Sequence, residues 1–317
     1  MVNIDKNCSD GIWSLKGIAI LSIFFAHMPI LESNVNYFWL ERAFSLLGIF
    51  GVPVFFFLSG FLFKKGDVIN RTKWLLIPLV IWGTLTYSFH CIPSAVDFNI
   101  IDFLLWICGS NCYLYFVSVL ISVILLFNVF DYPIFWFLVG VLSVFLTDYH
   151  YIPYTQDWTP YLNPFNFISY YSFGILSRNI NCVWKLMCNR VLVIPLIIIL
   201  VVFYTYTPVC KEFWYFNLPS FFLCIVFIVL SCNIIINLSN QSCMVIAIGK
   251  ISFVIYLSHM QIATTLNKFL PRIFSGYLEP VKVIVAFIIA TICVIILDRV
   301  IRMMKIDKIR PYIGFRG

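Results

Sequence analysis

The most regular feature of the chain is a succession of apolar stretches, each about as long as one membrane crossing. Breaks at Pro, Gly, Asn and charged clusters separate ten such stretches. A transmembrane helix needs roughly 20 apolar residues to cross the hydrocarbon core. We therefore predict an all-α polytopic membrane protein with about ten transmembrane helices. The predicted segments are 12–31, 44–63, 74–92, 103–128, 133–149, 164–177, 191–207, 219–238, 247–267 and 281–301.

Two of these segments are irregular. Segment 164–177 is short, and segment 103–128 contains Gly109 and Ser110, which predict a broken or partly re-entrant helix. The first stretch is too long for a signal peptide, and no small-residue cleavage site follows it. Because the segments fill the chain, we expect residues 1–317 to form a single transmembrane domain.

The basic residues predict the orientation of the chain. With the N-terminus inside, most of the 21 Lys and Arg residues fall in inner connections. This asymmetry follows the positive-inside rule, so both termini are predicted to be cytoplasmic. The basic residues on the outer side are Arg42, Lys211, Lys268, Arg272 and Lys282.

Composition supports the membrane assignment and narrows the partners. The chain is 62% hydrophobic and 11% charged, whereas soluble domains carry about 25% charged residues. The net charge is +7, but the basic residues lie between the apolar stretches and do not cluster on one soluble face. This distribution argues against a nucleic-acid partner. The eleven cysteines form no CxxC pair, and no carboxylate–histidine cluster predicts a metal site.

The first apolar stretch carries the main candidate for catalysis. Lys16 and His27 are eleven residues apart, which places them on one helix face about 16 Å apart along the axis. A titratable residue within a membrane span indicates a function. Histidine can accept and return a proton near neutral pH, as acyl transfer to a hydroxyl requires. We predict His27 as this base; a packed structural histidine is the alternative.

Three further sites carry polar residues that could support such chemistry. Ser59 precedes Gly60, a pair that also suits close helix packing. Arg71 and Lys73 occupy a short inner connection and suit the phosphates of coenzyme A, although a topology signal explains them equally well. Tyr256 and His259 lie three residues apart and share one helix face. They are either a supporting part of the site or structural residues.

The predicted outer connection at residues 148–164 is a candidate for binding a sugar, which would be the acceptor of the transferred group. It contains five aromatic residues and two aspartates but no Lys or Arg. Aromatic faces stack on sugar rings, and carboxylates accept hydrogen bonds from hydroxyls. Tyr151, Asp157 and Trp158 are therefore the predicted acceptor-binding residues. An interfacial aromatic belt is the alternative explanation for the aromatics.

Together these segments resemble the acyltransferase-3 family of membrane acyltransferases. The family's first helix carries a basic residue, ten residues and then a histidine, as Lys16 and His27 do. Three other family motifs occur in order. They are Phe-Phe-x-x-Ser-Gly, matched by residues 55–60; a basic run before a helix start with proline, matched by Arg71, Lys73 and Pro78; and Gly-x-Ile-Ser-x-x-x-Tyr-Leu-x-His, matched by Gly249, Ile251, Ser252, Tyr256, Leu257 and His259.

The chain departs from the family pattern at two positions. Members often carry an aspartate three residues before the first basic residue, where this chain has Trp13. Members often show Arg-x-x-Arg at the start of the third helix, where Arg71 is followed by Trp74. The second departure affects the predicted contacts to the phosphates of the donor.

The resemblance implies a membrane-bound O-acetyltransferase of the bacterial inner membrane. Acetyl-CoA would be the donor on the cytoplasmic side, without a bound cofactor, and the acceptor would be a saccharide such as O-antigen or exopolysaccharide. The short chain is most similar to the sugar O-acetyltransferases that include fucose acetylases and the enterobacterial common antigen acetyltransferase. A transporter or flippase of lipid-linked saccharides is the alternative; such proteins often show internal repeats, which we do not find.

Overall fold

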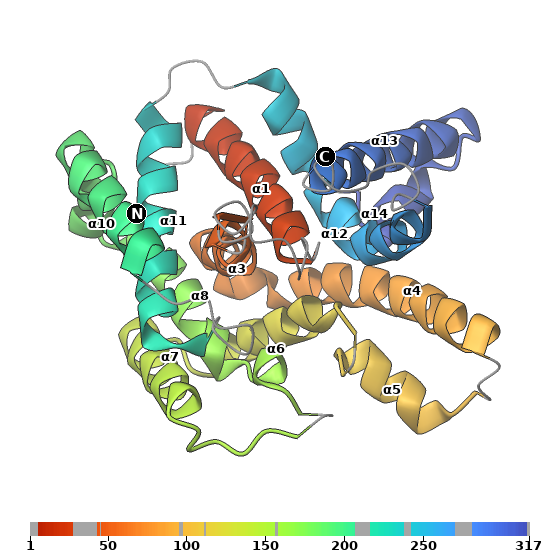
Figure 1. The fold of residues 1–317 in the computed structure, drawn as a ribbon, viewed down its shortest axis with the longest axis horizontal. Coiled ribbons are helices and arrows are strands. Elements are labelled where there is room, and N and C mark those ends of the chain that lie inside the picture. The colour runs from red at the N-terminus through yellow and green to blue at the C-terminus, as the bar shows by residue number, and fades with distance from the viewer. Residues whose placement is uncertain are drawn as a thin grey trace.

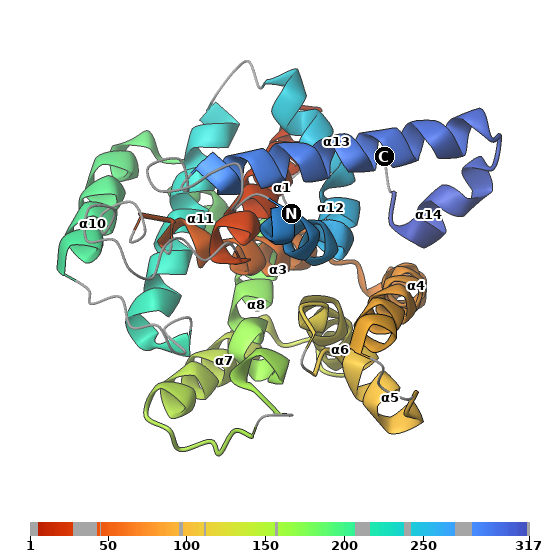
Figure 2. The same cartoon turned by 45° about the vertical axis from the view of Figure 1, so that its right-hand side comes forward.

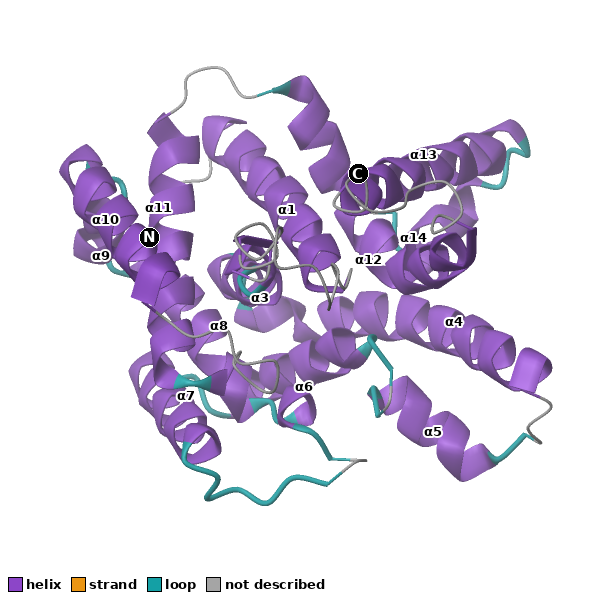
Figure 3. Ribbon diagram, viewed as in Figure 1, coloured by secondary structure: helices purple, strands orange, loops and turns teal. Residues whose placement is uncertain are grey.

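The computed structural model describes residues 6–27, 43–44, 46–94, 98–110, 112–155, 158–206, 216–237, 242–269 and 281–315. Within these ranges every regular element is a helix, and no strand occurs (Figure 3). A helix satisfies its backbone hydrogen bonds within one segment, which is what a bilayer demands of a spanning segment. The all-α prediction is therefore confirmed for this part of the chain.

Thirteen described α-helices build the molecule. They are α1 (Lys6–His27), α3 (Gly51–Phe61), α4 (Val68–Ser94), α5 (Ile100–Cys108), α6 (Tyr115–Val129), α7 (Pro133–Asp148), α8 (Phe165–Asn179), α9 (Asn181–Met187), α10 (Val193–Tyr206), α11 (Leu218–Asn237), α12 (Cys243–Phe269), α13 (Val281–Met303) and α14 (Arg310–Ile313), with 3₁₀ turns η2 (Lys65–Asp67), η3 (Pro160–Leu162), η4 (Arg190–Leu192) and η8 (Asp307–Ile309).

Five of the described helices are long and apolar enough to cross a membrane. A sixth span exists if α9 and the segment Arg190–Phe203, which are bent by 51° at a short break, form one crossing. Shorter apolar helices include α6 and α7. The five candidate spans are Cys8–Ala26, Lys65–Cys91, Leu218–Ile235, Cys243–Ile262 and Ile284–Met303.

The start of α4 differs from the predicted segment, whereas the break in segment 103–128 agrees with the prediction, and both have a physical reason. Helix α4 begins at Val68, before the predicted start at residue 74, because its polar first turns are helical while hydropathy marks only its apolar part. Segment 103–128 is broken, as its glycine indicated. Gly109 ends α5 with φ +100°, a left-handed conformation that favours glycine, and α6 begins at Tyr115.

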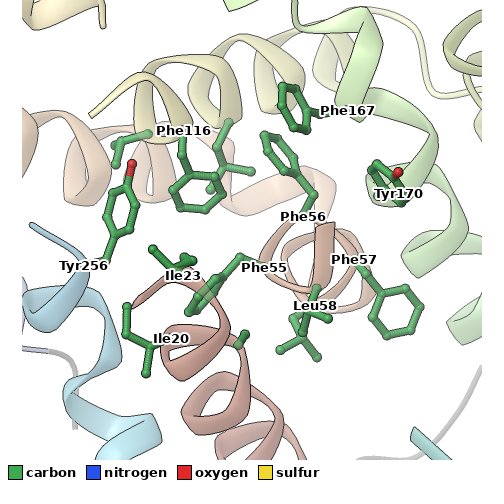
Figure 4. Packing of buried hydrophobic residues seen from close by; sticks show 14 of the residues in the cluster. Ile20, Ile23, Phe55, Phe56, Phe57, Leu58, Phe116, Phe167, Tyr170 and Tyr256 are labelled. Carbon is green, nitrogen blue, oxygen red and sulfur yellow. The ribbon is translucent and has the colours of Figure 1, made fainter. Parts of the chain in front are cut away.

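Helix α1 lies at the centre of the bundle, between α11 and α12 and against α3 (Figures 1 and 2). Its apolar side chains meet the phenylalanines of α3. Figure 4 shows Ile20 and Ile23 of α1 beside Phe55, with Phe56 turned toward Phe116 of α6. The core of the molecule therefore forms around the first helix.

Glycines let two pairs of helices approach closely, α12 with α1 and α3 with α8. A Cβ atom on Gly249 of α12 would lie 1.8 Å from the carbonyl oxygen of Trp13 in α1. A Cβ atom on Gly60 of α3 would lie 1.9 Å from the carbonyl oxygen of Tyr171 in α8. Small residues allow such contacts between membrane helices. Helix packing therefore accounts for Gly60 of the Phe-Phe-x-x-Ser-Gly motif and for Gly249 of the motif that ends at His259.

Polar contacts tie the connections between helices together at each end of the bundle. Lys65 Nζ lies 3.8 Å from Asp131 Oδ2, which joins the connection before α4 to the one before α7. At the other end of α7, the backbone N–H of Leu218 donates to Asp148 Oδ2 at 3.2 Å. Each of these two contacts joins two connections that the predicted ten-helix topology would place on the same side of the membrane.

Candidate active site

A cavity of about 420 Å³ opens beside the second half of α1. Ile23 and Ala26 of α1 form one wall, and Gly48, Ile49 and Val52 form the wall beside α3. The rest of the lining comes from segments far apart in the sequence. It includes Gly109, Cys112, Tyr113, Tyr115, Thr159, Tyr161, Asn166, Phe167, Tyr170, Phe216 and Met260.

The predicted catalytic position borders this cavity along the backbone of α1. The helix ends at His27, whose side chain lies outside the described residues. Position 27 follows the cavity-lining Ile23 by one turn, about 40° around the helix axis. The course of α1 is therefore compatible with a base at the cavity, and the role of His27 stays a prediction.

Lys16 lies on the same stripe of α1, closer to its N-terminus. The side chain is partly buried, and its Nζ atom lies 4.3 Å from the ring centroid of Trp13. A cation over a tryptophan face is stabilised by the ring quadrupole. Trp13 thus gives the lysine a partner on the same helix.

Arg71 binds the C-terminal end of α3. Its Nη1 donates to the carbonyl oxygen of Leu62 at 3.2 Å, and its Nη2 donates to that of Ser59 at 3.1 Å. These carbonyls lack partners within the helix, and a cation there also complements the helix dipole. Ser59 takes part through its backbone. Lys73 is exposed in the first turns of α4. The predicted donor contacts of both basic residues stay predictions.

Tyr256 and His259 lie buried in α12, behind the cavity wall. The imidazole contacts the carbonyl oxygen of Tyr256 through Nδ1, and its ring centroid lies 4.9 Å from that of Tyr113. Tyr113 donates from its hydroxyl to the Leu257 carbonyl at 2.7 Å, and its own carbonyl accepts from the Tyr256 hydroxyl. This network fixes Tyr113, which lines the cavity, to α12.

The connection between α7 and α8 holds the residues predicted to bind the acceptor, and their role stays a prediction. Tyr151 is 69% exposed and Trp158 is 47% exposed, and neither lines the cavity. Asp157 lies outside the described residues. Thr159 and Tyr161, from the same connection, do line the cavity. Burial raises the pKa of Tyr161 to about 12, so its phenol stays neutral at physiological pH.

A buried polar cluster holds this connection against α7 and α8. Asn166 Oδ1 accepts from Ser143 Oγ at 2.7 Å and from Thr147 Oγ1 at 3.2 Å, and its Nδ2 donates to the Pro160 carbonyl at 3.0 Å. Asn163 Nδ2 donates to Ser143 Oγ at 3.2 Å. The sequence analysis missed these residues. The signal was an asparagine pair at the start of an apolar helix.

The described wall of the cavity is uncharged. Its lining contains hydroxyls, an amide and a thiol, but no Lys, Arg, His, Asp or Glu among the described residues. Within the same part of the chain, no three His, Cys, Asp or Glu side chains lie together as a metal site would require. The chemistry available at the wall is therefore hydrogen bonding and apolar contact.

Helices long and apolar enough to cross a membrane define the chain as a polytopic membrane protein, and a cavity lies beside its first helix. The acyltransferase-3 family model, described as an acyltransferase domain, matches residues 10–299, so the chain belongs to this family. Comparisons with curated proteins and with solved structures gave no match. Family membership identifies the chain as a membrane acyltransferase.

Proposed function

We propose that the protein transfers an acetyl group from acetyl-CoA to a hydroxyl of a cell-surface or lipid-linked sugar, such as a unit of O-antigen or exopolysaccharide. It would act in the bacterial inner membrane, as a member of the sugar O-acetyltransferase subgroup that includes fucose acetylases. The observation that carries the proposal is the cavity at Ile23 and Ala26, because the following turn of α1 holds His27.

The donor would approach from the cytoplasmic side. Lys16 lies about 16 Å from His27 along α1, a distance that the pantetheine arm of acetyl-CoA can span. Lys16 and the exposed Lys73 are the candidate contacts for the phosphates. Arg71 already donates to two carbonyls, so we expect it to act there mainly by holding the end of α3.

The transfer itself would need one base. The imidazole of His27 would take the proton of the acceptor hydroxyl as the oxygen attacks the thioester carbon. The tetrahedral intermediate would then release the thiolate of coenzyme A, which takes the proton back from the imidazolium. An acyl-histidine relay is the alternative route, in which His27 attacks first and the sugar oxygen attacks second.

The predicted topology is part of this proposal. Ten crossings with both termini inside would place α1 with Lys16 at the cytoplasmic side and His27 toward the outer side. The ion pair of Lys65 with Asp131 and the contact of Leu218 with Asp148 support it, because each joins connections that this topology assigns to the same side.

Acetate on the surface polysaccharide tests the proposed function. We expect a strain without the gene to lose the acetate while the amount of polysaccharide is unchanged, and the wild-type gene to restore it. His27→Ala should fail to restore it although the protein is inserted in the membrane at the wild-type level. Full acetylation by His27→Ala would exclude this mechanism, and loss of the polysaccharide itself would favour a transporter.

A further inference from the structure

We propose that the cavity beside α1 is the acceptor subsite and that it selects an uncharged sugar ring. This inference rests on the proposed function, since it concerns the acceptor of the same reaction. Two observations carry it: the described wall is aromatic and polar, and it has no charged side chain.

Four aromatic rings of the lining form a continuous aromatic wall. The ring centroid of Tyr161 lies 5.1 Å from that of Tyr115 and 4.9 Å from that of Phe216. Phe167 completes the wall at 5.6 Å from Phe216. These rings come from four separate segments of the chain. Their planes are tilted or nearly perpendicular, at 56°, 76° and 85°, so the wall combines ring faces and ring edges, and a single ring face can take the C–H face of a sugar.

Charge decides which sugars this wall accepts. A buried carboxylate or phosphate needs a cation or several donors, because desolvation of an unpaired charge is costly. The described lining offers no Lys or Arg to pair with one, and His27, as the proposed base, must be neutral to take the proton of the acceptor hydroxyl. A uronic acid, a sialic acid or a sugar phosphate would therefore bind poorly. The phosphates of acetyl-CoA would bind poorly in this cavity for the same reason, so only the acyl end of the donor would enter it.

Size and rigidity fit a single ring. A volume of about 420 Å³ lies in the range of small-ligand pockets and is far too small for a polysaccharide chain. Thr159 and Tyr161 are hydroxyl-bearing residues of the wall. Their connection is held by Asn166, which is 1% exposed and bonded to Ser143 and Thr147. The subsite is thus formed before the sugar arrives.

The identity of the acetylated residue is the first test. Polysaccharide from the source strain and from a strain without the gene would be compared by tandem mass spectrometry. We expect the gene-dependent acetate on a neutral residue. Acetate on a uronic acid, a sialic acid or a phosphorylated residue would overturn the inference and leave the proposed function intact. Absence of any gene-dependent acetate would instead refute the proposed function.

Removal of one ring of the aromatic wall is the second test. The acceptor probe is the acetate-free polysaccharide repeat from the strain without the gene, and the donor is radiolabelled acetyl-CoA, with purified protein in detergent. Tyr161→Ala should raise the KM for the acceptor about tenfold and change the KM for acetyl-CoA less than about twofold. Tyr149→Ala is the matched control: this tyrosine is 59% exposed in the same connection and should change neither value.

A third variant covers the case in which Tyr161→Ala does not fold. Thr159→Trp places a large side chain at the cavity from a partly buried position of the connection. It should abolish transfer to the repeat while binding of acetyl-CoA, measured by equilibrium dialysis, is retained. Normal acceptor kinetics in a well-folded Tyr161→Ala or Thr159→Trp protein would overturn the assignment of the subsite.

Discussion

At the scale of single residues, Lys16 shows how a charge is kept on a partly buried face of a membrane helix. Its ammonium group lies over the ring of Trp13, 4.3 Å from the ring centroid, so the residue that departs from the family pattern packs against the cation. The ring quadrupole stabilises the positive charge that the proposed anionic donor would bind.

The donor role of Lys16 leads to a kinetic prediction. Lys16→Ala should raise the KM for acetyl-CoA about tenfold and leave the KM for the acceptor nearly unchanged, because one charge-assisted contact to phosphate is lost. Lys16→Arg should retain most of the affinity. Steady-state kinetics with labelled acetyl-CoA measure this, and the exposed Lys185 replaced by Ala is the control. An unchanged donor KM would leave Lys16 with a topological role only.

Gly249 carries a packing prediction at the same scale. A Cβ atom there would lie 1.8 Å from the Trp13 carbonyl oxygen, and backbone cannot move aside as a flexible side chain can. Gly249→Ala should lower stability by about 1–3 kcal/mol through overpacking. Thermal unfolding in detergent would measure it. Gly66→Ala is the control, since nothing lies within 4 Å of its Cβ position; equal effects of the two changes would contradict this account.

At the scale of elements, the C-terminal end of α3 is held by two arginines from other helices. Arg71 of α4 donates to Ser59 and Leu62, and Arg178 of α8 donates through Nη1 to the carbonyl oxygens of Phe61 and Phe63, each at 3.2 Å. A short, apolar helix with no basic residue in its own last turn thus receives its cations from its neighbours.

Loss of the buried arginine should therefore loosen this helix end. Arg178→Met keeps the length of the side chain but leaves two carbonyls without a donor, so we expect a loss of about 1–3 kcal/mol. Arg190→Met, which changes an exposed arginine, should have little effect. Thermal unfolding compares the two, and hydrogen exchange of residues 58–63 would localise the change. Wild-type stability of Arg178→Met would show that water replaces the guanidinium.

Periodicity and hydropathy predicted most elements because a bilayer leaves helices as nearly the only solution. The glycine at position 109 even indicated the break between α5 and α6. The start of α4 was misplaced, since helical backbone continues into polar residues that hydropathy does not score. Contacts such as Arg178 to Phe61 join residues 117 apart in sequence, so no local pattern could predict them.

At the scale of the whole molecule, the cavity is a product of tertiary structure. Ile23, Tyr115, Tyr161 and Phe216 are separated by long stretches of chain and meet only when the bundle is formed. Lys16 and His27 lie within one segment, so the sequence alone could propose α1 as the carrier of the chemistry. The residues that line the cavity could not be predicted in this way, and the acceptor roles of Tyr151 and Trp158 stay predictions.

The arrangement of the whole chain across the membrane leads to the last prediction. Cysteines introduced at Gly66 and Tyr151 should react from opposite sides, because the proposed topology puts the connection before α4 inside and the one after α7 outside. The background would have Cys210, which the proposed topology places outside, and the exposed Cys108, Cys182, Cys243 and Cys293 replaced by serine. A membrane-impermeant maleimide should label Tyr151→Cys in intact spheroplasts, and Gly66→Cys only after permeabilisation. Both positions are exposed, so burial cannot explain a difference between them. Labelling of both from outside would mean an even number of crossings between them. The proposed topology has an odd number, so this result would reject it, and with it the placement of Lys16 on the donor side.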